Sequence, residues 1–509
     1  MKSEKEIISW YKKHLAEKEE PYLLDKNQAR VIMDEHKNTL VTARAGSGKT
    51  RTLVAKIAYL IAYKHIVPEK IIVFAFNRKA CFEINERLTK ITYNGKPLFL
   101  DTPHIATTFH AFAYAALGGK KQIGNHLISE EENIKILQDI ISDDNSIGNV
   151  SQFITRAEQR FFKDYTELKN SISLIDSPCN QELLTKYYEY LVSYHAALKR
   201  KNLINFNQMM SQSRLKLRTL RFPYKYIFVD EYQDFSLLFL EQLRALRANC
   251  DGSHLLAVGD DWQAINRFAG SDVEFFKNFE KYFSEDVNRL FIPSNYRSGK
   301  QIVKNANYFM SCALKDFKGC KTGNKKLRAK IYLADVNALV PRRQISTKIP
   351  LLLLSYIKIL RKIIVENKGK TIKILHRNND LSFRGYSLDS FCKNLVDRLL
   401  NEKMISKNEW ELISWTTIHK SKGLEADVVI LLEVDAKKFP SKDKTNGLYE
   451  IFGEDEKAHF EDEARLFYVA LTRPKEKLYI LSKTTRYIEK DKKMNFLSYL
   501  NDDWIRRIV

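Results

Sequence analysis

Near the start of the sequence, an apolar segment leads into a glycine-rich loop that carries a lysine and a threonine. The loop reads VTARAGSGKT, close to the pattern GxxxxGK[ST], with Ala43 in place of the first glycine. Gly46 and Gly48 allow backbone N–H groups to turn inward around phosphate oxygens. Lys49 can reach the negatively charged β- and γ-phosphates, and the hydroxyl of Thr50 can bind Mg²⁺. The loop therefore predicts a site for the phosphates of a nucleotide.

Two acidic residues follow another apolar segment much later in the chain. The segment Tyr226–Val229 predicts a strand, and Asp230 and Glu231 follow it within the string DEYQD. Asp230 is placed to hold Mg²⁺ through the water shell of the metal, and Glu231 to polarise an attacking water as a general base. An acidic cap of the next helix would explain only one of the two acids. Together with the loop, the pair predicts a P-loop NTPase that uses ATP and Mg²⁺.

The string DEYQD is similar to the DExQD box of the UvrD/Rep helicases. Further segments resemble the other motifs of that family in the same order, from about residue 22 to residue 485. The strings DDWQAI, FAFNRKA and YVALTR resemble the DNA helicase IV branch more than UvrD. The resemblance implies a superfamily 1 DNA helicase. The matching segments are 24–28 (Q motif), 71–88 (Ia), 107–112 (Ib), 258–270 (III), 295–298 (IV), 416–425 (V) and 463–473 (VI).

The resemblance implies roles for residues around ATP. Arg297 and Arg473 match two arginines of a second lobe, whose forked guanidinium groups suit the charge on the γ-phosphoryl oxygens. Gln263 matches a glutamine that senses the γ-phosphate, and Tyr296 and Arg51 match a pair that sandwiches adenine. The expected catalytic residues are Lys49, Asp230, Glu231, Gln263, Arg297 and Arg473. The expected nucleotide contacts are Gln28 (adenine edge), Ala45, Gly46, Ser47, Gly48, Lys49, Thr50, Arg51, Tyr296 and Glu425 (near the ribose).

Three aromatic residues inside the motifs match positions that contact single-stranded DNA in the family. Stacking of a base on an aromatic ring contributes about 1–3 kcal/mol with little dependence on base type. A single aromatic residue is more often part of a core, so the position inside a motif carries the inference. Three others are polar and suit phosphate or relay contacts. The aromatic set is Phe76, His110 and Phe268, and the polar set is Thr108, Thr417 and His419.

The sequence departs from the family pattern in two places. Asn266 stands where relatives usually carry an aromatic residue, and Ala269 where several carry an arginine. One base-stacking position is therefore missing or replaced. We also expect the coupling between the nucleotide state and DNA affinity to be weaker, or to depend on other residues. UvrD and Rep also carry a large mobile domain in the second lobe, for which residues 378–412 leave little room.

Short apolar segments that end in polar or glycine-rich turns recur along the chain, and helical patterns follow them, such as 51–63. That alternation predicts an α/β fold with parallel sheets covered by helices, in agreement with the two RecA-like lobes that the resemblance implies. The predicted strands are 39–42, 71–75, 226–229, 255–258, 372–375, 428–432 and 478–481.

The domain boundaries follow from where this alternation stops. Residues 116–199 show helical periodicity, as at 130–141 and 182–199, without strand signals, and predict an all-helical insertion. We place the first, ATP-binding lobe at 1–115 and 200–294, and the second lobe at 295–509, with a reduced insertion at 378–412.

The chain is basic, with 84 Lys and Arg against 62 Asp and Glu and a net charge of +22. This excess favours a polyanionic partner, because neutralised phosphates release counterions, but a generally lysine-rich composition would give the same charge. The six cysteines form no CxxC pair, which argues against zinc and for reduced thiols in the cytoplasm. No secretory signal begins the chain, and the apolar run at 349–360 is too short to cross a membrane.

The leading hypothesis is an ATP-dependent helicase or translocase that moves 3′-to-5′ on single-stranded or partly duplex DNA. The polarity follows from the resemblance alone. The alternative is a UvrD-like ATPase subunit of an anti-phage or repair complex that acts with a partner nuclease. Co-purification with a nuclease would separate the two. Remodelling of RNA polymerase would need long heptad repeats, which the sequence lacks, and small-molecule metabolism would leave motifs Ia, III and VI unexplained.

Overall fold

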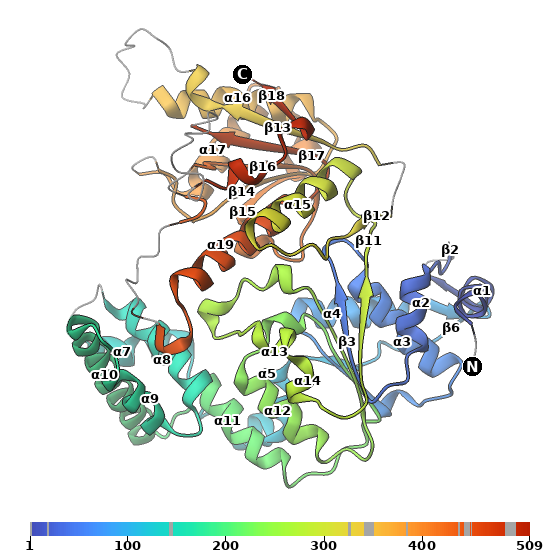
Figure 1. Ribbon diagram of the computed structural model, residues 1–509, viewed down its shortest axis with the longest axis vertical. Coiled ribbons are helices and arrows are strands. Elements are labelled where there is room, and N and C mark those ends of the chain that lie inside the picture. Colours follow the sequence, from blue (N-terminus) through green and yellow to red (C-terminus); the bar gives the residue numbers. More distant parts are fainter. Residues whose placement is uncertain are drawn as a thin grey trace. The chain divides into compact units, whose positions relative to one another are not determined.

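The computed structural model forms two compact units. The first unit comprises Met1–Ala43, Gly48–Ile292 and Thr445–Asp455, and the second comprises Arg44–Ser47, Pro293–Lys444 and Glu456–Val509. Each is described by itself, and Figure 1 labels their elements. The structure describes residues 3–17, 20–141, 146–323, 327–339, 351–382, 385–435, 438–441, 448, 450–483 and 495–508.

The first unit is built on a parallel six-stranded sheet in the order β10-β3-β9-β8-β4-β7. Its central strands are apolar on both sides, as expected for a parallel sheet covered by helices. The strands are β3 (Asn38–Ala43), β4 (Ile71–Phe74), β7 (Ala106–Thr107), β8 (Tyr226–Val229), β9 (His254–Gly259) and β10 (Val287–Ile292).

Alternate residues of these strands pack into two different cores. Val41 and Val258 join α1 (Glu4–His14), α2 (Lys26–Met33), α3 (Lys49–Ala62) and α4 (Arg78–Thr89). Their neighbours Leu40 and Ala257 face the other side, because successive side chains of a strand point to opposite faces. The helices on that side are α5 (Phe109–Ala116), α11 (Phe206–Leu217), α12 (Leu237–Arg247), α13 (Glu274–Lys277) and α14 (Phe279–Tyr282).

A small antiparallel sheet in the order β2-β1-β5-β6 completes the N-terminal part of this unit. Trp10 packs on the rings of Tyr59, Tyr63 and Tyr93, and so ties α1 to α3 and to this sheet. The strands are β1 (Leu15–Glu17), β2 (Glu20–Pro21), β5 (Ile91–Tyr93) and β6 (Lys96–Pro97).

Helices without strands follow α5, and several of them gather at the lower left of Figure 1. They enclose a separate apolar core that includes Phe153, Leu168 and Leu191. Phe452, from the 3-10 turn Glu450–Phe452, lies in the same core, although it falls within residues 295–509, the predicted second lobe. The helices are α6 (Gly119–Gln122), α7 (Glu130–Ile140), α8 (Ile147–Phe161), α9 (Tyr165–Ser173) and α10 (Pro178–Arg200).

The second unit contains another parallel six-stranded sheet, in the order β15-β14-β16-β17-β13-β18. Two short strands that precede this sheet in the sequence, β11 (Ser294–Asn295) and β12 (Lys321–Thr322), form a separate parallel pair. The two six-stranded sheets confirm the predicted α/β fold class. The strands are β13 (Lys330–Asp335), β14 (Ile372–His376), β15 (Ile413–Thr417), β16 (Ala426–Leu431), β17 (Pro474–Ser482) and β18 (Ile505–Ile508).

Helices of the second unit cover its sheet. Ile374 and Ile430 share a core with α16 (Leu351–Glu366) and α17 (Leu388–Asn401). The short helix α18 (Lys407–Glu411) follows α17, so residues 378–412 hold these two helices. Elsewhere α15 (Lys300–Ala313) meets α19 (Glu456–Leu471), with the rings of Phe309 and Phe467 5.0 Å apart. Among the described residues, no helix combines the length and apolar character needed to cross a bilayer.

Candidate nucleotide and nucleic-acid site

The glycine loop connects the end of β3 to the first turn of α3. Gly46 and Gly48 have φ angles of 73° and 82°, in the left-handed region that glycine adopts without strain. A Cβ atom at Gly48 would come within 3.2 Å of the side-chain nitrogen of Gln28, so the predicted adenine-edge residue lies directly beside the loop. Lys49 and Thr50 open α3, where unpaired backbone N–H groups and the helix dipole favour an anion.

The predicted acids lie at the end of β8, two strands from the glycine loop in a sheet ordered β3-β9-β8. The Nζ atom of Lys49 is 3.5 Å from the Oε2 atom of Glu231. Burial, followed by the adjacent charge of Glu231, raises the pKa of Asp230 to about 7, although Lys49 opposes the rise. A divalent cation would therefore be favoured here, because it restores a counter-charge to a buried carboxyl group.

A glutamine inside DEYQD links the acids to motif III. The amide nitrogen of Gln233 donates to Glu231 Oε2 at 2.5 Å, and its carbonyl oxygen accepts the N–H of Asp260 at 2.8 Å. Asp260 in turn accepts from the side chain of Gln263 at 2.6 Å. Only glycine fits at position 259, because a Cβ atom there would lie 2.5 Å from Gln233 Oε1, the oxygen that accepts from Asp260. The chain of contacts connects the predicted γ-phosphate sensor to the predicted general base.

Sequence reasoning did not single out Gln233 or Asp260 as site residues, although both lie within quoted motifs. Gln233 could have been found from its place inside DEYQD, because a simple acidic pair would not include a glutamine. Glu231 carries a second unusual feature, a φ angle of 53° that non-glycine residues seldom adopt. Such strain is kept where neighbouring contacts hold a side chain in a defined direction.

The predicted adenine-binding residue Arg51 has an aromatic partner inside the first unit. Its guanidinium carbon lies 4.7 Å from the centre of the Tyr22 ring, and the Tyr22 hydroxyl donates to the carbonyl of Arg51 at 2.7 Å. Gln28 is also fixed, because its side-chain oxygen accepts the N–H of Asp25 at 3.1 Å in a capping box. Tyr296, the partner predicted from the sequence, belongs to the second unit and is 42% exposed.

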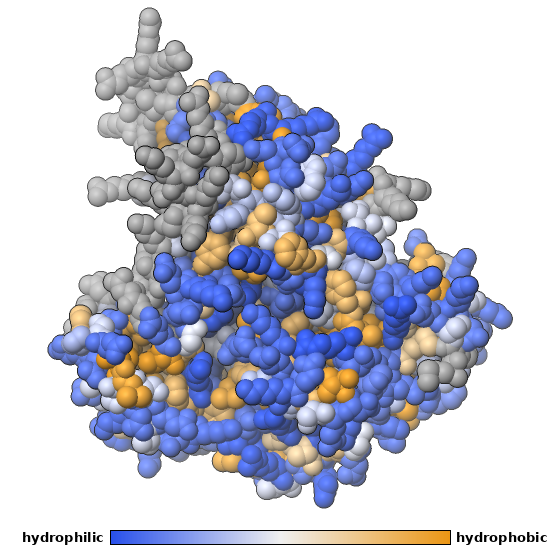
Figure 2. Space-filling model, viewed as in Figure 1, coloured by the Kyte–Doolittle hydropathy of each residue, from blue (hydrophilic) through white to orange (hydrophobic). Residues whose placement is uncertain are grey.

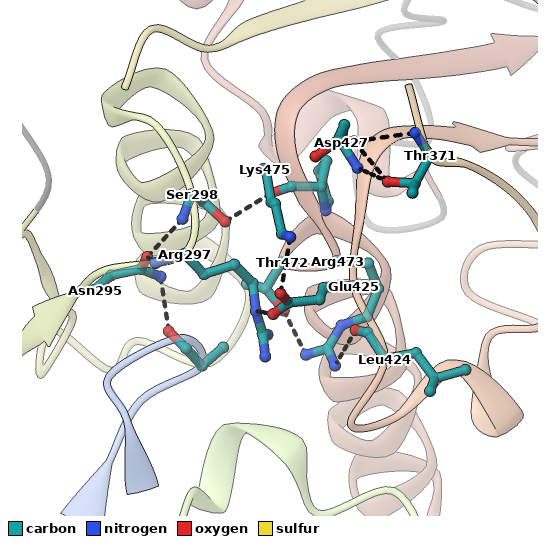
Figure 3. Close-up of polar contacts among 12 residues, drawn as sticks. Asn295, Arg297, Ser298, Thr371, Leu424, Glu425, Asp427, Thr472, Arg473 and Lys475 are labelled. Atoms are coloured by element: carbon teal, nitrogen blue, oxygen red, sulfur yellow. Dashed lines mark hydrogen bonds and ion pairs between the residues drawn. The ribbon is translucent and has the colours of Figure 1, made fainter. Parts of the chain in front are cut away.

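In the second unit, Arg297 and Lys475 share one carboxylate (Figure 3). The Nε atom of Arg297 donates to Glu425 Oε2 at 2.6 Å, and Lys475 Nζ lies 3.0 Å from Glu425 Oε1. Burial alone would raise the pKa of Glu425, but Arg297 and Lys475 outweigh it and lower that pKa. Glu425 is thus an anion that holds the predicted arginine in place.

The second predicted arginine, Arg473, is buried and bonded within its own unit. Its Nε atom donates to the carbonyl of Val469 at 2.8 Å, and its two terminal nitrogens donate to the carbonyl of Leu424 at 3.2 Å and to the Thr472 hydroxyl at 3.1 Å. Figure 3 shows Arg473 and Leu424 close to Glu425. These contacts fix the guanidinium group beside the motif V carboxylate.

Asn295 bonds to the glycine loop, whose residues Arg44–Ser47 belong to the second unit. Its amide nitrogen donates to the carbonyl of Ala45 at 2.7 Å, and its oxygen accepts the N–H groups of Arg297 at 3.0 Å and Ser298 at 2.9 Å (Figure 3). The N–H of Tyr296 donates to the carbonyl of Gly46 at 2.8 Å. The string NYRS therefore holds the loop through Asn295 as well as supplying Arg297.

The six predicted DNA-contact residues fall into two groups. Phe76 and Phe268 are 43% and 47% exposed, so part of each side chain is accessible from solvent. Phe76 and His110 line one small cavity together with Asp230 and Glu231. Burial lowers the pKa of His110, so this side chain is neutral at pH 7.

The polar candidates are more enclosed. The Thr108 hydroxyl caps α5 by accepting the N–H of Ala111 at 3.1 Å, and the Thr417 hydroxyl accepts the N–H of Lys420 at 3.4 Å. Burial, reinforced by the charge of Arg377, lowers the pKa of His419 to about 4. His419 is therefore uncharged at neutral pH, and any contact that it makes with a phosphate would be a neutral hydrogen bond.

Two family models match most of this chain. Residues 24–284 match the UvrD/REP helicase N-terminal domain, and residues 386–485 match the UvrD-like helicase C-terminal domain. The chain therefore belongs to the UvrD/Rep helicase family.

Three relatives show how far the likeness extends. DNA helicase IV of Escherichia coli (strain K12) is 28% identical, over 90% of this chain and 68% of that protein. The ATP-dependent DNA helicase Rep of Buchnera aphidicola is 26% identical, over 75% of this chain and 55% of its own length. A probable DNA helicase II homolog of Mycoplasma capricolum is 28% identical, over 62% of this chain and 45% of its own length. The chain thus spans about two thirds of the first relative and about half of the other two.

Proposed function

We propose that this protein is an ATP-dependent DNA helicase or translocase that moves 3′-to-5′ on single-stranded DNA. The observation that carries the proposal is the link in the first unit from Lys49 through Glu231 and Gln233 to the segment that contains Gln263. It joins a phosphate-binding lysine, a base for the attacking water and the segment that also carries Phe268. Membership of the UvrD/Rep helicase family supports DNA as the polymer that stimulates hydrolysis.

The residues present suit Mg-ATP. The Thr50 hydroxyl and the Asp230 carboxylate would hold Mg²⁺, which supplies charge neutralisation to the phosphates when bound. Lys49 and the N–H groups at the start of α3 bind the outer phosphates, and Glu231 takes a proton from the attacking water. Gln28 and Arg51 would contact the adenine of ATP, and Tyr22 holds Arg51 in position.

Lobe closure is the proposed coupling between hydrolysis and movement. Arg297 and Arg473 belong to the second unit and carry the charge that a loosening γ-phosphoryl group needs. We expect ATP to favour closure, and product release to reopen the lobes. Bases would stack on Phe76 and Phe268, and each cycle would shift the strand between the lobes.

The test is ATPase rate and strand separation on 3′-tailed, 5′-tailed and blunt duplexes. The wild-type protein should hydrolyse ATP faster with single-stranded DNA and separate only the 3′-tailed duplex. Lys49→Ala and Glu231→Gln should lower turnover by about 10²–10⁴-fold, since each removes a group acting on the reaction itself, while DNA binding persists.

Two outcomes would count against the proposal. Vigorous hydrolysis by either variant would contradict the assigned roles of Lys49 and Glu231. Stimulation of the ATPase by DNA without strand separation on any substrate would contradict helicase activity by the protein alone, and it would favour the alternative, an ATPase subunit that needs a partner nuclease.

A further inference from the structure

A cavity of about 460 Å³ lies among the helices of the first unit, away from every motif used above. Its walls come from the end of α8, the start of α9, the end of α10 and the start of α11. This volume is within the usual range for small-molecule sites, about 300–1,000 Å³.

The floor of the cavity is a buried carboxylate with three hydrogen-bond donors. Glu158 accepts from His195 at 2.8 Å, from Asn205 at 2.6 Å and from Asn207 at 3.0 Å. Only 2% of Glu158 is exposed. A buried polar network of this kind fixes its members, so His195 and Asn207 present their remaining atoms to the cavity in defined directions.

The sides of the cavity combine aromatic rings with carboxamides. Phe162 and Tyr165 line it, and the Tyr165 ring packs edge-on against His195 with centroids 5.3 Å apart. Gln208 and Gln212 line it as well. The Gln208 oxygen accepts the N–H of Asn205 at 3.2 Å, while neither its amide nitrogen nor the Gln212 side chain has a partner among the residues described.

This combination matches a nucleobase. Aromatic side chains stack on the flat face of a base, and carboxamides pair with the donors and acceptors on its edge. Glu158 is the only carboxylate among the residues described in the wall, and its oxygens are already bonded. Lys199, near the end of α10, also lines the cavity and offers a positive charge for the attached phosphate.

We propose that this cavity binds a nucleobase, either an unpaired base of a DNA strand or the base of a free nucleotide. The DNA source rests on the proposed helicase function, whereas the free-nucleotide source does not. A base held here would be unstacked from its neighbours, as in sites that take an extruded base into a pocket.

Photocrosslinking of the full chain distinguishes the sources. One arm uses a single-stranded oligonucleotide containing 4-thiothymidine, and the other uses 4-thiothymidine monophosphate. Crosslinked peptides are mapped by mass spectrometry. Crosslinks at Phe162 or Tyr165 from the oligonucleotide assign a DNA base, and crosslinks there from the monophosphate alone assign a free nucleotide. The absence of crosslinks at either residue in both arms would overturn the proposal.

Variants provide the second measurement. Tyr165→Leu and, separately, the exposed Gln212→Ala should weaken binding of the probe that crosslinks, by about 10-fold for loss of the stacking ring. The matched control is Tyr190→Leu on α10, outside the cavity wall, which should bind like wild type. Equal affinity of both cavity variants and wild type would contradict the site even if crosslinks form.

The outcome is separable from that of the helicase proposal. If DNA fails to stimulate the ATPase while the monophosphate still crosslinks at Tyr165, the proposed function fails and the base site stands. If DNA stimulates the ATPase normally but neither probe crosslinks in the cavity, the base site fails and the proposed function stands.

Discussion

At the level of single residues, Gln233 is the side chain that organises the catalytic end of the first unit. It is fully buried and bonds to Glu231 and to the backbone of Asp260. Glu231 also has a left-handed backbone, and the Gln233 amide holds its carboxylate by a hydrogen bond. Gln233 is therefore a positioning residue, acting through Glu231.

Replacement of Gln233 by leucine should lower kcat for ATP by roughly 10-fold, the value expected for loss of a buried hydrogen bond to a charged group. KM for ATP should change little, because Lys49 and the loop are untouched. The measurement is steady-state ATPase kinetics with saturating DNA. Gln242→Leu is the matched control, since Gln242 is another buried glutamine of the first unit, bonded to Ser213 and away from the site. An equal loss of kcat in both variants would mean that Gln233 serves only stability.

Phe268 tests whether motif aromatics contact DNA. It is 47% exposed on a short turn after Gln263. Phe268→Ala should weaken single-strand affinity by about 5–100-fold, the range for loss of one stacked base, with basal ATPase largely intact. Fluorescence anisotropy with a labelled oligonucleotide measures this affinity. The control is Phe317→Ala, because Phe317 is 81% exposed and lies outside the motifs. A loss of basal ATPase alone would show that Phe268 supports the ATP site instead.

At the level of elements, the segment before α19 is anchored in the helical core of the first unit. Besides Phe452, Glu454 pairs with the buried Arg156 at 2.9 Å, and Arg160 donates to the carbonyl of Phe452 at 2.8 Å. The same helices expose apolar side chains, visible as orange patches at the lower left of Figure 2. Exposed apolar side chains of this helical segment are Ile134, Leu174, Leu183 and Val192, each at least 37% exposed.

Phe452→Ala should destabilise the first unit by roughly 3 kcal/mol, because it removes a buried ring and leaves a cavity. Urea denaturation monitored by circular dichroism measures this change. The control Phe82→Ala, on an exposed phenylalanine of α4, should alter the free energy of unfolding by less than about 0.5 kcal/mol. Equal midpoints for Phe452→Ala and wild type would show that the segment does not contribute to this core.

At the level of the whole molecule, the net charge of +22 requires an explanation that composition alone does not give. If the excess serves DNA binding, affinity for single strands should fall with salt, by a slope of about −0.7 per phosphate contact in log K against log salt. Anisotropy titrations between about 50 and 200 mM salt measure the slope. A slope near zero would indicate that the charge is compositional and that stacking alone holds the strand.

The sequence by itself determined the parts of this protein that local patterns encode. The glycine loop, the acids after β8 and the strands predicted from short apolar runs all lie where the sequence placed them, because the two faces of a buried parallel strand need apolar residues. Strands β7, β10, β13, β15 and β18 were not predicted. All but β13 are edge strands, and β10, β15 and β18 are partly exposed and carry polar residues such as Arg289 and Arg506, so no long apolar run marks them.

Only the tertiary structure decided which distant groups meet. The Gln233–Asp260 link, the packing of Arg51 over Tyr22, the bond of Arg473 to Leu424 and the anchoring of Phe452 each join residues far apart in the chain. No periodicity encodes such pairs, because they depend on strand order and helix packing rather than on neighbours in sequence. The cavity above Glu158 arises in the same way, from four helix ends that meet only once the helices have packed.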